Sequence, residues 1–206
     1  MLPEKAITEY MDIYEKKYGK KLTKEEAEEQ ARSLCDLFSI LYDMDLKERR
    51  RKAKLTDRPK GYHLDDGETY NCQICRVHIQ NQATWYDKNG IKCLTCQKAL
   101  DKKIIPASVC HDKDSWYALY EFEYYFNIKP ATIRKLVRQG RLKARIIQTD
   151  IGTNYFYMLL IKDNSGILPP KPESYLVTNE QGMTHVEYKK VDTAKLEELV
   201  TNSKTK

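Results

Sequence analysis

The chain has 206 residues and a formal net charge of +6, with 41% hydrophobic and 32% charged residues. That length accommodates one domain or two to three small ones. The longest apolar runs, such as residues 155–161, are far too short to span a bilayer, so no membrane partner is expected. The N-terminus lacks the charged-then-apolar layout of a signal peptide. We therefore expect a cytoplasmic protein, nucleoid-associated if it is prokaryotic.

Residues 1–55 are predicted to form a helical hairpin. Pro3 suits a first helical position, and Gly19 is a natural end of the first helix. Thr23 and Glu26 fit a capping box that begins the second helix. The apolar stripe of the second helix comprises Ala27, Ala31, Leu34, Cys35, Phe38, Leu41 and Tyr42. This stripe must be buried against the rest of the chain or against a second copy, so a homodimer through these helices is one expectation.

A basic stretch follows, with eight Lys and Arg residues against two acids over residues 47–60. Residues 47–54 can prolong the second helix, whereas Pro59 and Gly61 break it. Residues 56–69 are assigned to a basic linker. This stretch is either a solvated connector or an arm that lies along nucleic-acid phosphates.

Residues 70–108 carry two Cys-x-x-Cys pairs separated by 17 residues. The four candidate metal ligands are Cys72, Cys75, Cys93 and Cys96. This spacing is typical of a four-cysteine zinc site, in which the thiolates close a tetrahedral shell and leave no position for a substrate. In a cytoplasmic protein, paired cysteines are better explained as metal ligands than as disulfides. We therefore expect one structural Zn²⁺.

Between the cysteine pairs, residues 83–86 and 91–92 read as strands around an Asn-Gly turn, and a helix begins at Cys96. The order of knuckle, hairpin, knuckle and helix resembles a treble-clef or zinc-ribbon finger. Such a finger is a scaffold and specifies no function by itself. Because the module is small, the metal should supply most of its folding energy. Cys110 and His111 are adjacent candidates for a second metal.

Residues 109–168 are predicted to form a winged helix-turn-helix. An acidic, aromatic first helix precedes the turn at residues 127–130, and a second helix follows over residues 131–139. Two strands, residues 143–148 and 155–161, form the wing. Residues 129–145 hold seven bases and no acid, a pattern that favours an anionic partner.

This segment resembles the helix-turn-helix of excisionases and MerR-type regulators over about residues 117–147. Thr132-Ile133, Leu136-Val137 and Gly140-Arg141-Leu142 keep the frame of that group, and Asn127 stands in place of its turn glycine. The N-terminal hairpin and the zinc module lie outside the family pattern. No long C-terminal dimerisation helix of the MerR type is predicted, so the resemblance is closer to excisionase-like architectural binders.

The resemblance and the charge pattern together predict a DNA-contacting surface. A helix in the major groove reads base edges with its exposed side chains. With Ile133, Leu136 and Val137 in the core, the expected DNA contacts are Ala131, Thr132, Arg134, Lys135, Arg138, Arg141, Lys143 and Arg145. Thr132 and Lys135 are assigned to base edges, the arginines of the helix and its end to phosphates, and the wing residues to further phosphates.

Residues 169–206 are weakly patterned, with an extended proline segment, a short helix over residues 193–200 and a disordered tail over residues 201–206. The expected fold class is therefore α+β and multi-module: helical hairpin, four-cysteine zinc finger and winged helix-turn-helix.

The expected function is sequence-specific binding of double-stranded DNA by a zinc-stabilised transcriptional regulator or recombination and excision accessory factor. One alternative is an RNA-binding protein whose zinc module and aromatic residues, such as Trp85 and Tyr86, engage single-stranded bases. Another is an adaptor whose N-terminal helices dock a protein. The chain carries no Gly-rich phosphate loop, serine elbow or His-Glu-x-x-His helix, so no enzymatic activity is expected.

Overall fold

The computed structural model describes residues 2–202 and divides into two compact units, Met1–Pro59 and Lys60–Lys206. We call them the helical unit and the core unit. The fold is mixed α+β, as the sequence indicated, and the described part of the chain forms four small antiparallel sheets. None of the helices over residues 2–202 combines the length and apolar character needed to cross a membrane.

The helical unit consists of α1 (Glu4–Tyr18) and α2 (Lys24–Asp57). The predicted capping box is confirmed, because the Glu26 amide donates to Thr23 Oγ1 at 3.2 Å and the Thr23 amide donates to Glu26 Oε2 at 2.9 Å. The basic stretch continues α2 as far as Asp57.

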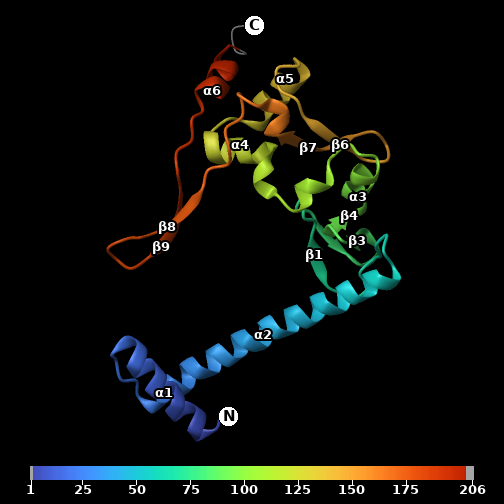
Figure 1. Ribbon diagram of the computed structural model, residues 1–206. Coiled ribbons are helices and arrows are strands. Elements are labelled where there is room, and N and C mark those ends of the chain that lie inside the picture. The colour runs from blue at the N-terminus through green and yellow to red at the C-terminus, as the bar shows by residue number, and fades with distance from the viewer. Residues whose placement is uncertain (1, 203–206) are drawn as a thin grey trace. The chain divides into compact units, whose positions relative to one another are not determined.

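The two helices cross with their first turns together (Figure 1). An antiparallel hairpin would bring the end of α1 beside the start of α2. Instead, Lys24 forms an ion pair with Glu4, and the Tyr10 hydroxyl donates to Gln30 Oε1 at 3.2 Å. In each of these pairs the two partners are 20 residues apart in the sequence. The helical unit is therefore a crossed pair of helices rather than the predicted hairpin.

The crossing buries only the start of the α2 stripe. Ile7, Ala27 and Ala31 are buried there. Beyond Ala31, large apolar side chains of α2 are between 42% and 66% exposed: Leu34, Leu37, Phe38, Ile40, Leu41, Tyr42 and Met44.

The core unit begins within the predicted linker. The Tyr62 amide donates to the Tyr86 carbonyl at 2.9 Å, and the Leu64 amide donates to Thr84 Oγ1 at 2.8 Å. Both Tyr62 and Leu64 are buried. The linker predicted over residues 56–69 is therefore much shorter, because its apolar residues pack onto the following module.

The first half of the core unit, which we call the cysteine half because it carries both Cys-x-x-Cys pairs, contains two hairpins and a helix. Its elements are β1 (Thr69–Asn71), β2 (His78–Gln80), β3 (Thr84–Asp87), β4 (Gly90–Cys93) and α3 (Leu94–Asp101). β1 pairs with β2, and β3 pairs with β4 around the predicted Asn-Gly turn. The expected order of hairpin followed by helix is confirmed.

The second half is built on a three-stranded sheet. Its elements are β5 (Trp116–Ala118), α4 (Leu119–Phe126), α5 (Pro130–Arg138), β6 (Arg145–Gln148) and β7 (Asn154–Leu160). The predicted helices and the β6–β7 hairpin are present, and β5 adds an unpredicted third strand beside β7. Asn127 adopts the left-handed conformation (φ 54°) that ends α4, as expected for the turn.

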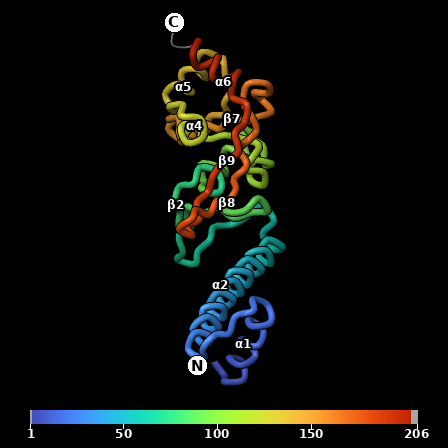
Figure 2. The backbone as a smooth tube through the Cα atoms, turned by 90° about the vertical axis from the view of Figure 1, so that its left-hand side faces the viewer, coloured from blue at the N-terminus to red at the C-terminus, as the bar shows by residue number. Residues whose placement is uncertain are grey.

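The C-terminal segment is more ordered than its composition indicated. β8 (Ser174–Thr178) and β9 (Thr184–Tyr188) form an unpredicted hairpin, and α6 (Ala194–Thr201) confirms the short helix. Figure 2 shows α4, α5 and α6 gathered at one end of the core unit. Thr201 closes α6, and residues 203–206 of the predicted tail lie outside the described residues.

One hydrophobic cluster joins the two halves of the core unit. We call it the shared core; it contains Cys72, Ile74, Cys96 and Ala99 from the cysteine half and Trp116, Ile147, Met158 and Leu160 from the three-stranded sheet. A second cluster is formed mainly by α4, α5 and α6. The predicted zinc module and the β6–β7 hairpin therefore share one hydrophobic core and are not separate domains.

Candidate functional site

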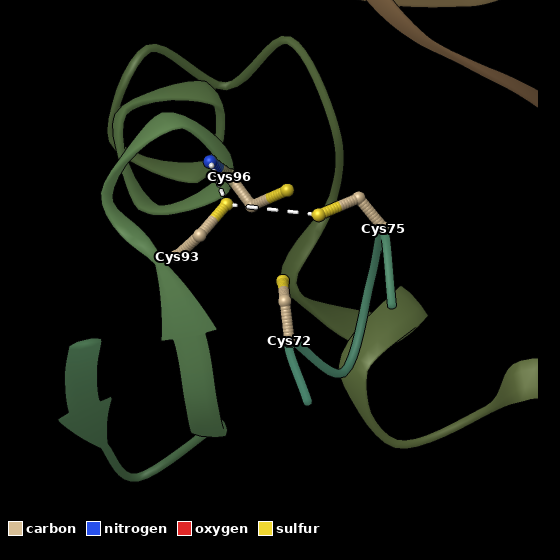
Figure 3. Close-up of side chains that lie close together, drawn as sticks. All are labelled: Cys72, Cys75, Cys93 and Cys96. Carbon is tan, nitrogen blue, oxygen red and sulfur yellow. Dashed lines mark hydrogen bonds between the residues drawn. The ribbon is translucent and has the colours of Figure 1, made fainter. Parts of the chain in front are cut away.

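Four cysteine side chains converge in the cysteine half, and their sulfur atoms all lie within 4.8 Å of one another. Figure 3 shows Cys72 and Cys75 approaching from the knuckle after β1, while Cys93 ends β4 and Cys96 lies in the first turn of α3. Three of the four are buried and Cys75 is half-buried. The cluster could hold a metal ion, so the four predicted ligands are brought together as that prediction requires.

Backbone geometry holds the thiols in place. Arg76 adopts a positive φ of 64°, and its amide donates to the Cys72 carbonyl at 3.0 Å, closing the first knuckle. In the second knuckle, the Cys96 amide donates to Cys93 Sγ at 3.4 Å. Such amide hydrogen bonds stabilise a thiolate and orient it toward an ion. Cys-x-x-Cys therefore places two sulfurs on one side of the site at each knuckle.

Four thiols packed this closely oppose the loss of all their protons when no cation is present. Hydrogen bonds with Cys75, Cys93 and Cys96 lower the pKa of Cys72, so one thiolate is well supported. Hydrogen bonds with Cys72 raise the pKa of both Cys93 and Cys96, and burial adds to this rise. A bound divalent ion offsets the negative charge, so metal binding and proton release are coupled at this site.

The β6–β7 hairpin touches the cysteine cluster directly. The Tyr155 hydroxyl lies 3.2 Å from Cys75 Sγ, although the two residues are 80 apart in the sequence. Burial and this hydrogen bond raise the pKa of Tyr155, so the phenol stays protonated and can donate to a Cys75 thiolate. At the hairpin tip, Asp150 forms an ion pair with Lys98 of α3 at 2.6 Å. The cysteine cluster therefore helps to position this hairpin.

The residues predicted to contact DNA lie on α5, in the segment that follows it and at the start of β6. Ile133 and Leu136 are fully buried, while Ala131, Arg134 and Arg138 are exposed. Thr132, Lys135 and Arg141 are half-buried, and Lys143 and Arg145 are exposed. The predicted inner and outer faces of α5 thus agree with the burial pattern, except that Val137 is only half-buried.

Arg145 has an anionic partner within the chain. Its guanidinium forms an ion pair with Asp163 at 2.8 Å. The neighbouring Asn164 is buried and binds Lys143 through both backbone groups, at 2.8 and 2.9 Å. Arg145 therefore reaches an external phosphate only in competition with Asp163, whereas the Lys143 ammonium is exposed.

A groove of about 410 Å³ lies between the N-terminal ends of α4 and α5 and the strand β7. We call it the tyrosine groove; it is lined by Leu119, Tyr120, Pro130, Arg134, Asn154, Tyr155, Phe156 and Tyr157. The Arg134 guanidinium lies 6.0 Å from the centre of the Tyr157 ring. Burial and Glu121 raise the pKa of Tyr120, and the neighbouring Arg76 guanidinium opposes that rise. No local sequence signal marks this groove, because its walls come from three separate segments.

Other candidate residues have structural roles. Tyr86 is buried in β3, so its ring is unavailable for base stacking. Cys110 lies in the shared core, where burial raises its pKa, and His111 contacts Asn89 Oδ1 at 3.2 Å. Within residues 2–202, the four-cysteine cluster is the one group of three or more His, Cys, Asp and Glu side chains placed to bind a metal.

Comparison of the chain with protein-family models, with curated proteins and with solved structures finds no match. The likeness of residues 117–147 to excisionase and MerR-type regulators therefore remains a resemblance of motif.

Proposed function

We propose that the protein binds double-stranded DNA and that a structural Zn²⁺ stabilises its fold. The observation that carries the proposal is α5, a helix with exposed arginines on one face and buried Ile133 and Leu136 on the other. The surrounding segment, residues 129–145, contains no acid. An acid-free basic helix beside a β-hairpin suits phosphate contact and entry into the major groove.

The donor set supports Zn²⁺ as the metal. Four thiolates suit zinc, with iron as the main competitor, and a closed four-coordinate shell leaves no site for a substrate. The ion would hold both knuckles and keep the β6–β7 hairpin in place through Cys75, Tyr155 and the shared core. Its role is therefore to build the surface rather than to react.

The residues of α5, with Arg141 just beyond its end, divide by position into two roles. We assign Thr132 and Lys135 to contacts with base edges. We assign Arg134, Arg138 and Arg141 to contacts with phosphates. Phosphate contacts supply most of the affinity and set the register, while base contacts supply specificity. The same surface serves a transcriptional regulator or an accessory factor in recombination and excision.

Neutralising Arg134 and Lys135 should strongly reduce the affinity for duplex DNA. Arg134→Ala removes one phosphate contact and should reduce the salt-dependence slope by about 1. Lys135→Ala removes a base contact and should cost about 1–3 kcal/mol of discrimination between sequences. Fluorescence anisotropy with the double variant R134A/K135A measures both effects.

The matched control is K16A/K17A, which removes two exposed lysines from α1 in the helical unit. It takes away the same charge without touching α5. If the control weakens duplex binding as much as R134A/K135A does, the attraction is diffuse and the proposed surface is wrong.

The tyrosine groove favours a second candidate function, binding of single-stranded nucleic acid. Aromatic side chains beside arginines are typical surfaces for stacking unpaired bases. Tyr120 is 54% exposed beside Arg76 and Arg134, whereas the buried Tyr86 is not available. Tyr120→Ala should lower affinity for single-stranded RNA or DNA by about 1–3 kcal/mol and leave duplex affinity nearly unchanged. If wild type and Tyr120→Ala bind single strands with equal affinity, the tyrosine groove is not a site for single-stranded nucleic acid.

A further inference from the structure

The middle of α2 presents a continuous apolar surface within the helical unit. Leu34, Leu37, Leu41 and Met44 recur at the spacing of the inner positions of a helical pair, and Phe38 widens the same face. These side chains are between 42% and 62% exposed. Contiguous exposed apolar surface of this kind marks an interaction site in a folded protein.

The charges of α2 are divided sharply about this surface. Residues 24–46 hold seven carboxylates and two bases, whereas residues 47–57 hold six bases and two carboxylates. Some of these charges form exposed pairs within the helix, such as Arg32 with Glu28 at 2.9 Å and Arg49 with Asp45 at 2.7 Å. Exposed pairs of this type contribute little and leave the overall polarity of the helix in place.

We propose that two copies of the chain pair through α2 in antiparallel orientation, about a two-fold axis beside Ser39. In that register Leu34 lies opposite Met44 of the second copy, and Leu37 lies opposite Leu41. The same register brings the acidic segment 26–29 opposite the basic segment 49–52 of the second copy. The apolar pattern and the charge pattern therefore each favour the same antiparallel register.

A parallel pair is disfavoured by the same charges. It would place acidic half against acidic half and basic half against basic half, and like charges at an interface repel. α1 covers Ala27 and Ala31, so direct apolar contact ends near Leu34 and the charged segments flank it. A two-fold interface must be complementary to itself. α2 meets that condition only when its direction is reversed in the second copy.

Sedimentation velocity of the full chain tests the pairing. Wild type should sediment as a dimer at micromolar concentration and dissociate on dilution. L37D/L41D should be monomeric at every concentration tested, with unchanged helical circular dichroism. The matched control L176D adds a carboxylate at a 72% exposed leucine of β8 and should remain dimeric. A wild-type monomer at all concentrations would overturn the proposal, as would a dimer that L37D/L41D leaves intact.

Cysteine cross-linking tests the orientation, in a Cys35→Ser background that removes the exposed thiol. The double variant L34C/M44C should oxidise to a covalent dimer, because the register places each introduced thiol opposite its counterpart. L34C alone should stay uncross-linked. Cross-linking of L34C alone at the same rate would demonstrate a parallel pair and overturn the antiparallel arrangement. These outcomes are independent of nucleic-acid binding, so they stand or fall separately from the proposed function.

Discussion

Replacing one of the four clustered cysteines, as in Cys96→Ser, is expected to release the proposed metal and unfold most of the core unit. Structural zinc sites contribute about 10–16 kcal/mol to folding, which matches or exceeds the about 5–15 kcal/mol by which whole domains are stable. Cys96 is fully buried in the shared core, so the loss also removes a packing partner of the three-stranded sheet. Elemental analysis and thermal unfolding followed by circular dichroism measure the two effects.

The control for that experiment is Cys35→Ser, which makes the same chemical change at an exposed cysteine of α2. It should keep one metal per chain and the wild-type melting temperature. If Cys96→Ser also retains both, the cysteine cluster is not a structural metal site.

The second large effect is expected at a buried ion pair in the β3–β4 hairpin. The Lys92 side chain is fully buried, and its ammonium donates to Asp87 Oδ1 and, at 2.7 Å, to the Gly90 carbonyl. Asp87→Ala leaves that ammonium buried without its counter-charge. Breaking a buried pair in this way costs about 3–5 kcal/mol. Urea denaturation of the metal-loaded protein should therefore show a much lower midpoint.

A double variant separates the charge from the packing. D87A/K92M removes both charges and places an unbranched apolar side chain where the lysine stem lay. It should recover a large part of the lost stability, because no unpaired charge remains. If D87A is as stable as wild type, or if D87A/K92M is no more stable than D87A, the ion pair does not have this role.

The elements that could be predicted are those encoded by short-range signals. Pro130 begins α5 and Gly140 follows its end, the capping box begins α2, and the Asn-Gly turn joins β3 to β4. The four cysteines were found because thiolate ligands need fixed local spacing at each knuckle. In each case, neighbours within a few residues determine the geometry.

The features that were missed depend on contacts between distant segments. Tyr155 reaches Cys75 across 80 residues, and Lys92, which reads as an exposed charge beside a turn, is fully buried against Asp87. Helical spacing identified the apolar stripe of α2, but it could not reveal that α1 crosses only the first part of that stripe. The β8–β9 hairpin was missed because Leu176 and Val186 are exposed, so its strands do not alternate between buried and exposed sides as a half-buried hairpin would.

The most direct test of the central claim is the binding of zinc-loaded protein to random duplex DNA across a salt series, measured by fluorescence anisotropy. The basic helix and hairpin predict a preference for duplex over single strands and a log–log slope of about −4 to −6, equivalent to about four to seven phosphate contacts. The R134A/K135A variant should show a shallower slope than wild type. Absence of duplex binding at low salt, or a slope that R134A/K135A leaves unchanged, would contradict the claim and assign the basic face to a protein partner.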